Sequence, residues 1–392
     1  MSSRGRLFGR LRTVAHDPLA AYDALTAGCT RFVRLDELCR LAGERYPGLV
    51  PGAEELTAEA GLAQRDKQGL EKAQGAFLAA VLSDPDAGRH LCHAMLLPRE
   101  DSRAHLARFE ARGELSLAGA HLKRQGNAVV LTMSNPRFLN AEDESTLEGM
   151  EVAVDVALLD RKSELCVLRG DTVTHTKHAG HRVFGAGINL THLYQGKIRF
   201  LWYLIRDLGF VNKIYRGLAL PDASPEEHCI EKPWVAAVER FAIGGHCQIL
   251  LTMDYVIAAE DAYLTLPARK EGIIPGAANL RLPRFVGARV ARQAILAERR
   301  LDCASPEGRR ICDEIVPVTG MDQAIGRTID HLTNSGVVSA AGNRRAFRAG
   351  EEPLDTFRRY MAVYAREQAQ CHFSPALIAN LERHWDAANR RI

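Results

Sequence analysis

The spacing of apolar residues changes twice along the chain, and each change predicts a different arrangement of secondary structure. From about Pro18 to Leu122, apolar residues recur at helical spacing, as in "TRFVRLDELCRLAGERY", with Pro and Gly between such segments. From "NAVVLTMSNP" to about Val318, short apolar runs alternate with helical stretches, and after Met321 the pattern is helical again. We expect a helical N-terminal domain at residues 1–122, an α/β core at 123–320 and a helical C-terminal region at 321–392.

Within the core, the pattern is specific enough to predict individual elements. Short runs rich in β-branched and other apolar residues predict buried strands, and longer amphipathic or apolar stretches predict helices. The expected strands are Ala128–Met133, Leu165–Arg169, Trp234–Val238 and Val256–Ala259, and the expected helices are Glu144–Asp160 and Gln248–Tyr255. Such alternation is typical of an α/β sheet with crossover helices.

Two glycine-containing segments each follow strand-like sequence and precede a helical stretch. They are "HRVFGAGINL" at residues 181–190 and "FAIGGHCQILL" at 241–251. Backbone N–H groups at helix N-termini favour negative charge, so two such turns together could form a paired donor site. A pair of this kind stabilises the enolate that forms when a thioester loses an α-proton. The alternative is that each glycine serves only tight packing or a left-handed turn.

Composition and charge narrow the possible partners. Lys and Arg total 51 and Asp and Glu total 48, and the net charge of +3 gives no general attraction to nucleic acid or to a membrane surface. Nine Cys are scattered without CxxC pairs, and no apolar run has transmembrane length, so we expect a cytoplasmic protein. The basic N-terminal segment "MSSRGRLFGRLRTVAHDP" suits either a targeting presequence or an amphipathic docking helix.

The segments "FGAGINL", "AIGGHCQILL" and "EGIIPGAANLRLPRFVG", in this order, resemble the crotonase (enoyl-CoA hydratase/isomerase) superfamily over roughly residues 125–317. The resemblance implies a crotonase-like ββα core, an acyl-CoA substrate and a homo-oligomer, either a trimer or a hexamer. It also implies an oxyanion hole formed by the backbone N–H groups of Ile188 and Gly245. Hydratases carry a glutamate at each of two positions that are Gln248 and Ala268 here. Neither side chain exchanges protons near neutral pH, so we do not expect hydration.

A narrower resemblance accounts for the lost carboxylates. The segments "NPRFLNAEDESTLEGMEVAVDVALLD", "IEKPWVAAVERFAIGG" and "LPARKEGIIPGAANLRL", after a long helical extension, are similar to the cofactor-independent 3,5-dihydroxyphenylacetyl-CoA 1,2-dioxygenases of antibiotic biosynthesis. That family implies an aryl-acetyl-CoA thioester and dioxygen as reactants, arylglyoxylate and CoA as products, and neither metal nor flavin. Glu142, Arg206 and Gln248 fall on its substrate-binding positions. Without the resemblance they would suit a solvated acid, a surface ion pair and a helix-cap amide, respectively.

The chemistry of this assignment follows from the substrate. A thioester α-carbon that bears an aryl ring is unusually acidic, so an oxyanion hole and a base can generate a carbanion that reduces dioxygen directly. The resulting α-peroxide can attack the neighbouring carbonyl and expel CoA.

Two alternative functions stay open. One is an isomerase, decarboxylase or thioesterase of the same superfamily, for which Glu271 offers a carboxylate, and the other is a non-catalytic assembly subunit.

Histidines near the glycine turns raise further possibilities. His246 directly follows the oxyanion residue, where crotonases have glycine. It could crowd the pocket, titrate near neutrality as an acid or base, or be a tolerated substitution. The three histidines of "HTKHAGH" at residues 175–181 have a spacing that could hold a metal, but no carboxylate or Cys joins them, so we expect no metal. Lys177 and Arg182 could meet CoA phosphates.

Overall fold

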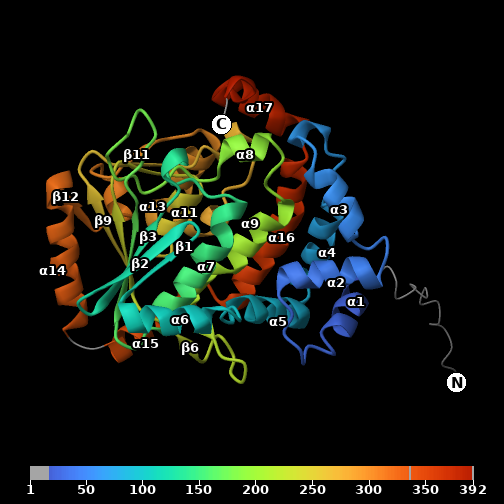
Figure 1. Ribbon diagram of the computed structural model, residues 1–392, viewed down its shortest axis with the longest axis horizontal. Helices are drawn as coiled ribbons and strands as arrows, with labels where there is room; N and C mark the ends of the chain where they lie inside the picture. Colours follow the sequence, from blue (N-terminus) through green and yellow to red (C-terminus); the bar gives the residue numbers. More distant parts are fainter. Residues whose placement is uncertain (1–16, 335–336, 391–392) are drawn as a thin grey trace, which may run out of the picture.

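The computed structural model describes residues 17–334 and 337–390, so nearly all of the basic N-terminal segment lies outside the described residues. Figure 1 shows a twisted sheet on one side of the molecule, with the blue N-terminal helices and the red α16 side by side on the other. Within the described part of the chain, no helix has both the length and the apolar character needed to cross a bilayer.

The main sheet has seven strands in the order β1-β2-β3-β4-β7-β9-β12. Their bounds are Glu114–Leu117, Ala120–Gln125, Ala128–Met133, Leu165–Gly170, Trp234–Val238, Tyr255–Ala259 and Glu314–Val316. The first three strands pair antiparallel and the others pair parallel. Every residue of β4 and β7 is buried, as expected for parallel strands that are covered on both faces.

Two smaller sheets and several helices complete the core. A three-stranded sheet is formed by β8 (Phe241–Ile243), β10 (Tyr263–Thr265) and β11 (Leu301–Asp302), and a short ladder by β5 (Leu218–Ala219) and β6 (Cys229–Ile230). The core helices are α7 (Glu144–Leu159), α8 (Leu190–Tyr194), α9 (Phe200–Leu208), α10 (Phe210–Arg216), α11 (Gly245–Leu250), α12 (Ala268–Glu271) and α13 (Ala278–Leu296). The α7 helix provides the crossover between the parallel strands β3 and β4.

The predicted core elements agree closely with these bounds. The strands β3 and β7 have the predicted ends, β4 is one residue longer, and β9 begins one residue earlier. The helix α7 begins at Glu144 as predicted because Asp143 caps it: its carboxylate accepts from Ser145 N–H at 3.0 Å, and its own N–H donates to Thr146 Oγ1 at 3.1 Å. The predicted α/β class is confirmed.

The helix predicted at Gln248–Tyr255 is wrong at both ends. The helix α11 begins three residues earlier because Gly244, with φ 55° and ψ −117°, turns the chain directly into a helix. It ends at Leu250 because Asp254 is bound to the sheet. The Asp254 N–H donates to the Trp234 carbonyl at 2.9 Å, and its carboxylate accepts from the Trp234 N–H at 2.7 Å. The residues that follow therefore pair with β7 as a strand.

Helices from both ends of the chain pack together beside the core. Their bounds are α1 Pro18–Leu25, α2 Leu35–Arg45, α3 Ala53–Ala60, α4 Lys72–Ser83, α5 Pro85–Leu96, α6 Ser102–Arg112, α14 Met321–Thr333, α15 Val337–Glu351, α16 Leu354–His372 and α17 Pro375–Trp385. The helix α16 packs against α4, α5 and α9, while α14 packs against β9 and β4 on the sheet (Figure 1). The sheet begins at Glu114, before the boundary predicted at residue 123, and the domain limits themselves stay a prediction.

Candidate active site

The two glycine turns meet at the inner end of a large cleft. The cleft has a volume of about 860 Å³ and is lined by Ile188 of the first turn, by Glu271 of α12 and by residues of β8, β10 and α17. Behind it lies a small cavity of about 30 Å³, whose wall includes Ile188, Gly245, Gln248 and Glu271. The cleft is within the size range of sites for small-molecule ligands. Because Ile188 and Glu271 border both spaces, they mark the point where cleft and cavity join.

The backbone around Ile188 leaves its N–H group available. The residue before it, Gly187, has φ 79° and accepts at its carbonyl from Glu142 N–H at 2.8 Å, while Asn189 N–H donates to the Glu142 carbonyl at 2.8 Å. These bonds fix the backbone on both sides of Ile188. Within residues 17–334 and 337–390, no acceptor is found for the N–H of Ile188 or of Gly245.

The two turns are in direct contact, and their glycines make that contact possible. A side chain at Gly187 would place its Cβ 3.3 Å from the Gly245 nitrogen and 2.9 Å from the Ile243 carbonyl oxygen. The two available N–H groups are therefore carried by adjacent backbones. Such a pair has the composition of an oxyanion hole, which stabilises charge that develops on a carbonyl oxygen.

His246 lies behind the first turn and outside the two cavities. Its side chain is fully buried, and its Nδ1 accepts a hydrogen bond of 2.9 Å from Gly187 N–H. Burial lowers the pKa of His246 to about 4, so the ring is neutral at physiological pH. The possibility that it titrates near neutrality is therefore wrong, and it does not line the cleft, so it does not crowd the pocket there. His246 instead holds the Gly187 backbone in place.

Arg206 is the centre of a buried cluster that contains all three predicted substrate-binding residues. Its Nε donates to Glu142 Oε1 (2.9 Å), its Nη2 to Glu142 Oε2 (2.8 Å) and the Gly245 carbonyl (2.9 Å), and its Nη1 to Asp207 Oδ1 (3.0 Å) and Gln248 Oε1 (2.5 Å). All five guanidinium N–H groups are thus engaged. We call Glu142, Arg206, Asp207 and Gln248 the Arg206 cluster.

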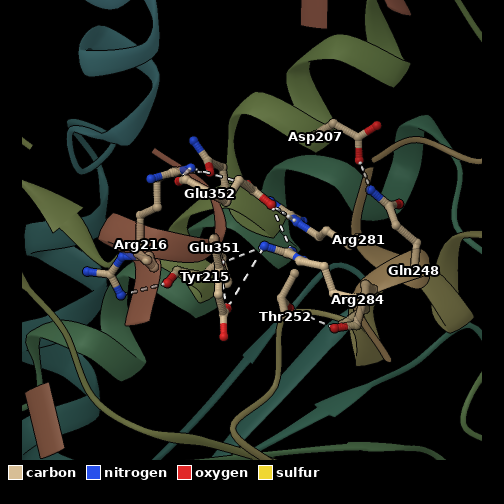
Figure 2. A network of polar contacts seen from close by, with 12 residues as sticks. Asp207, Tyr215, Arg216, Gln248, Thr252, Arg281, Arg284, Glu351 and Glu352 are labelled. Atoms are coloured by element: carbon tan, nitrogen blue, oxygen red, sulfur yellow. Dashed lines mark hydrogen bonds and ion pairs between the residues drawn. The ribbon is translucent and has the colours of Figure 1, made fainter. Parts of the chain in front are cut away.

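This cluster excludes the simpler interpretations of its members. The Arg206 side chain is 3% exposed, so it is not a surface ion pair. Glu142 is buried and precedes the Asp143 cap, so it is not a solvated acid at the start of α7. Gln248 lies inside α11, and its Nε2 donates to Asp207 Oδ1 at 2.7 Å, as Figure 2 shows, so it is not a helix-cap amide.

Asp207 was not identified from the sequence. It follows Arg206 directly on α9, and neighbours on a helix usually point in different directions, so the motif "IRDLG" gives no signal that both face one site. Burial raises the pKa of the Asp207 carboxyl, although Arg206 and the Gln248 amide oppose the rise. For Arg206, burial disfavours the charge, but Glu142 and Asp207 outweigh burial and raise the pKa. The cluster therefore holds a permanent cation beside the two glycine turns.

The loop of "HTKHAGH" forms one rim of the cleft. His175, Lys177 and His178 line it, whereas Arg182 donates to the Gly170 carbonyl at 3.0 Å and is absent from the lining. The prediction of a phosphate contact therefore stays open for Lys177 only, because Arg182 does not line the cleft. Among the described residues, no group of three or more His, Cys, Asp or Glu side chains is arranged to hold a metal ion.

Comparison with known proteins places this cleft in a family. Residues 123–370 match the family model described as enoyl-CoA hydratase/isomerase. The chain belongs to the enoyl-CoA hydratase/isomerase family. The predicted membership in this family, also called the crotonase superfamily, is thus confirmed, and the match extends beyond residue 317, where the resemblance was expected to end.

Relatives within the enoyl-CoA hydratase/isomerase family differ in how much of the chain they share. The chain is 47% identical to a "(3,5-dihydroxyphenyl)acetyl-CoA 1,2-dioxygenase" of Amycolatopsis orientalis over 349 residues, which is 89% of this chain and 80% of the relative. It is 25% identical to a "Short-chain-enoyl-CoA hydratase" of Clostridium acetobutylicum over 62% of this chain and 86% of that relative. The narrower resemblance is therefore confirmed as well.

Solved structures of the family confirm the fold. A crystal structure of an enoyl-CoA hydratase from Mycobacterium avium subsp. paratuberculosis K-10 superposes with a TM-score of 0.56 at 20% identity, covering 68% of this chain and 98% of that chain. An enoyl-CoA hydratase from Bacillus halodurans gives a TM-score of 0.55 at 19% identity, covering 68% and 99%. The predicted crotonase-like core is thus confirmed.

Proposed function

We propose that this protein is a dioxygenase that oxidises the α-carbon of (3,5-dihydroxyphenyl)acetyl-CoA and cleaves the thioester, giving 3,5-dihydroxyphenylglyoxylate and CoA. The observation that carries the proposal is the 47% identity, over 89% of the chain, to a relative with that activity in its name. The site supports it: the two positions at which hydratases carry carboxylates hold Gln248 and the buried Ala268. Water addition to an alkene needs an acid and a base there.

The reaction begins at the two glycine turns. The thioester oxygen accepts from the N–H groups of Ile188 and Gly245, and loss of one α-proton leaves the electron pair on an enolate that these donors stabilise. The enolate reduces dioxygen, and a carbon–oxygen bond forms at the α-carbon. The peroxide attacks the thioester carbonyl and expels CoA, and cleavage of the oxygen–oxygen bond with loss of the second α-proton leaves the ketone. One thioester and one dioxygen thus give one arylglyoxylate and one thiol.

Within this proposal the members of the Arg206 cluster have different tasks. Arg206, Asp207 and Gln248 all line the small cavity, and Gln248 is the member we place against the substrate. Arg206 has no free N–H group for a ligand, and Glu142 holds two of its donors. We therefore assign Arg206 and Glu142 to the substrate site as positioning residues: Arg206 fixes the Gly245 carbonyl and the Gln248 amide oxygen.

We also propose a homo-oligomer, a trimer or hexamer, which works in the cytoplasm and serves antibiotic biosynthesis. Two observations support parts of this proposal. Val338 and Phe347 of α15 are 85% and 65% exposed, which suits a surface covered by another subunit. All nine cysteines lie in the described residues and are free thiols, which suits a reducing compartment.

The test is an oxygen-electrode trace of chelator-treated protein with (3,5-dihydroxyphenyl)acetyl-CoA, beside a free-thiol assay and mass analysis of the acid. The proposal predicts that dioxygen is consumed in step with thiol release and that the product is the arylglyoxylate. The same mixture under nitrogen should release no thiol. Equal thiol release under nitrogen, with unoxidised arylacetate as product, would show a thioesterase instead. Activity that is lost on chelation and restored by iron would also contradict the proposal.

A further inference from the structure

Glu271 is the carboxylate that borders both the cleft and the small cavity. It ends the short helix α12, which begins at Ala268, and its side chain lines both spaces. Residues three apart lie on the same face of a helix. Glu271 is therefore one turn beyond Ala268, the position from which a hydratase carboxylate acts, and on the same side of α12. The small cavity that it borders is also walled by Gly244, Gly245 and Ile188.

The carboxylate has no task in the protein's own packing. Within the described chain, its side chain takes part in no hydrogen bond or ion pair. The nearby carboxylate of Glu298, by contrast, pairs with Arg269 and Lys270. A half-buried carboxylate without a partner is costly unless a ligand uses it. The Arg206 cluster shows the contrast, because both oxygens of Glu142 accept from the guanidinium.

Burial and the nearby Glu298 raise the pKa of Glu271 to about 7. A base whose pKa lies near the working pH is the most effective at proton transfer, since it is both ionised and basic. The ionisable groups beside it or in the lining of the two spaces come from several elements. They are Lys270 and Arg269 on α12, Glu298 after α13, Tyr203, Arg206 and Asp207 on α9, Tyr364 on α16, His384 on α17, and Arg137, His175, Lys177, His178, Tyr263 and Arg390 elsewhere in the lining of the cleft.

We propose that Glu271 is the base that removes the α-proton of the bound thioester. The C–H bond breaks, the electron pair passes to the thioester oxygen at Ile188 and Gly245, and the proton forms an O–H bond with a Glu271 oxygen. This assignment rests on the proposed function for the identity of the thioester. It does not need dioxygen, because the enolate forms before dioxygen reacts.

The experiment measures exchange of the α-hydrogens for deuterium under nitrogen. The protein is incubated in D₂O with (3,5-dihydroxyphenyl)acetyl-CoA, and deuterium in the recovered thioester is followed by mass spectrometry. We expect Glu271→Gln to bind the thioester as tightly as the wild type and to exchange about 100- to 10,000-fold more slowly, the usual contribution of a general base. Glu271→Asp should retain part of the rate, because it keeps a carboxylate on a shorter stem.

A pH profile and a matched control distinguish a base from a structural residue. Exchange by the wild type should rise with pH to a plateau above about 7, and Glu298→Gln should keep the plateau but shift the rise to lower pH, because it removes the like charge. Glu271→Gln with more than about a tenth of the wild-type exchange rate would overturn the assignment. So would a Glu298→Gln profile identical to that of the wild type.

The outcomes also separate this inference from the proposed function. If exchange depends on Glu271 but the protein consumes no dioxygen when assayed in air, the assignment of Glu271 as the base is supported and the proposed dioxygenase activity is contradicted. Dioxygen consumption together with normal exchange in Glu271→Gln would support the dioxygenase and contradict the assignment of Glu271 as the base. A wild type that exchanges no α-hydrogen above the buffer rate would overturn the assignment of Glu271.

Discussion

Two buried clusters of arginine and carboxylate lie close together in the molecule, and they are built in opposite ways. In the Arg206 cluster one cation serves two carboxylates and an amide. In the second, which we call the Glu352 cluster, one fully buried carboxylate serves three cations, Arg216, Arg281 and Arg284, at 3.1, 2.9 and 3.0 Å. Figure 2 shows the Glu352 cluster, with Asp207 and Gln248 of the Arg206 cluster beside its arginines.

The difference lies in what each cluster holds. The Arg206 cluster binds the Gly245 carbonyl and borders the small cavity, so its geometry is transmitted to the proposed oxyanion site. The Glu352 cluster joins α10 and α13 to the segment between α15 and α16, so it ties the C-terminal helices to the core. We therefore expect similar ion pairs to serve catalysis in the Arg206 cluster and stability in the Glu352 cluster, and four changes test this division.

The largest effect is expected from Glu352→Ala. Removal of one partner from a buried ion pair typically costs about 3–5 kcal/mol, because the remaining charges stay buried. Three uncompensated arginines place this change at the upper end of that range. The free energy of unfolding, measured by urea denaturation, should fall accordingly, while turnover per folded molecule should be largely kept.

Glu351→Ala is the control: its side chain is 51% exposed, and its loss should cost at most about 1 kcal/mol. Equal losses of unfolding free energy in both variants would contradict a structural role for the Glu352 cluster.

The second effect concerns Gly245 on the catalytic side. A Cβ at this position would lie 2.9 Å from both Arg206 Nη2 and Glu142 Oε2, so Gly245→Ala should disturb the Arg206 cluster while it keeps the N–H group. Gly245→Pro adds the same crowding and removes the N–H. We expect the Pro variant to turn over about 100- to 1,000-fold more slowly than the Ala variant, the usual loss for one oxyanion donor. Similar rates for the two folded variants would mean that this N–H does not contact the developing charge.

The third effect is a pH dependence of stability that belongs to the Glu352 cluster. Burial alone would raise the pKa of Glu352, but Arg281, Arg216 and Arg284 outweigh it and lower the pKa to about 2, against 4.5 in the unfolded chain. Between these values the unfolded state binds more protons, so stability rises with pH. The contribution, roughly 3 kcal/mol, is fully present above about pH 4.5 and is lost as the pH falls toward 2. Urea denaturation from pH 2.5 to 6 should show a flatter dependence in Glu352→Gln; equal slopes would contradict the depressed pKa.

The sequence predicted the core elements better than the polar clusters, and the reason is physical. The strands β3 and β7 and the start of α7 follow from local apolar patterns and one cap, all of which lie within a few residues of each other. The pairs that build the clusters are distant: Arg281 and Glu352 are 71 residues apart, and Arg206 and Glu142 are 64 apart. No local pattern reports such a pairing.

The candidate site shows the same limit in its details. The glycine turns were visible as strand-to-helix sequence, but Glu142, Arg206 and Gln248 were assigned by resemblance to a family and not from their own surroundings. The role of His246 depended on burial, which lowers its pKa and leaves it as an acceptor for Gly187 N–H. Burial at one position is set by the whole fold, so the residue type alone could not decide between titration near neutrality and a tolerated substitution.

The smallest effect is expected from Gln248→Glu, which keeps the length of the side chain and changes only the group that faces Asp207. One new carboxylate oxygen can still accept from Arg206 Nη1, but the other replaces the Nε2 that donates to Asp207 at 2.7 Å. Two carboxylates this close are not both readily ionised, so the pair should hold a proton that it loses as the pH rises. We expect turnover about tenfold lower at pH 8, with a smaller deficit at pH 6, where protonation restores a donor to Asp207.

The exposed Gln323→Glu on α14 is the control for a change of charge alone and should show no such dependence. A Gln248→Glu variant with wild-type turnover across this range would show that the hydrogen bond to Asp207 has no part in positioning the site, and the contrast between the two clusters would then rest on Gly245 alone.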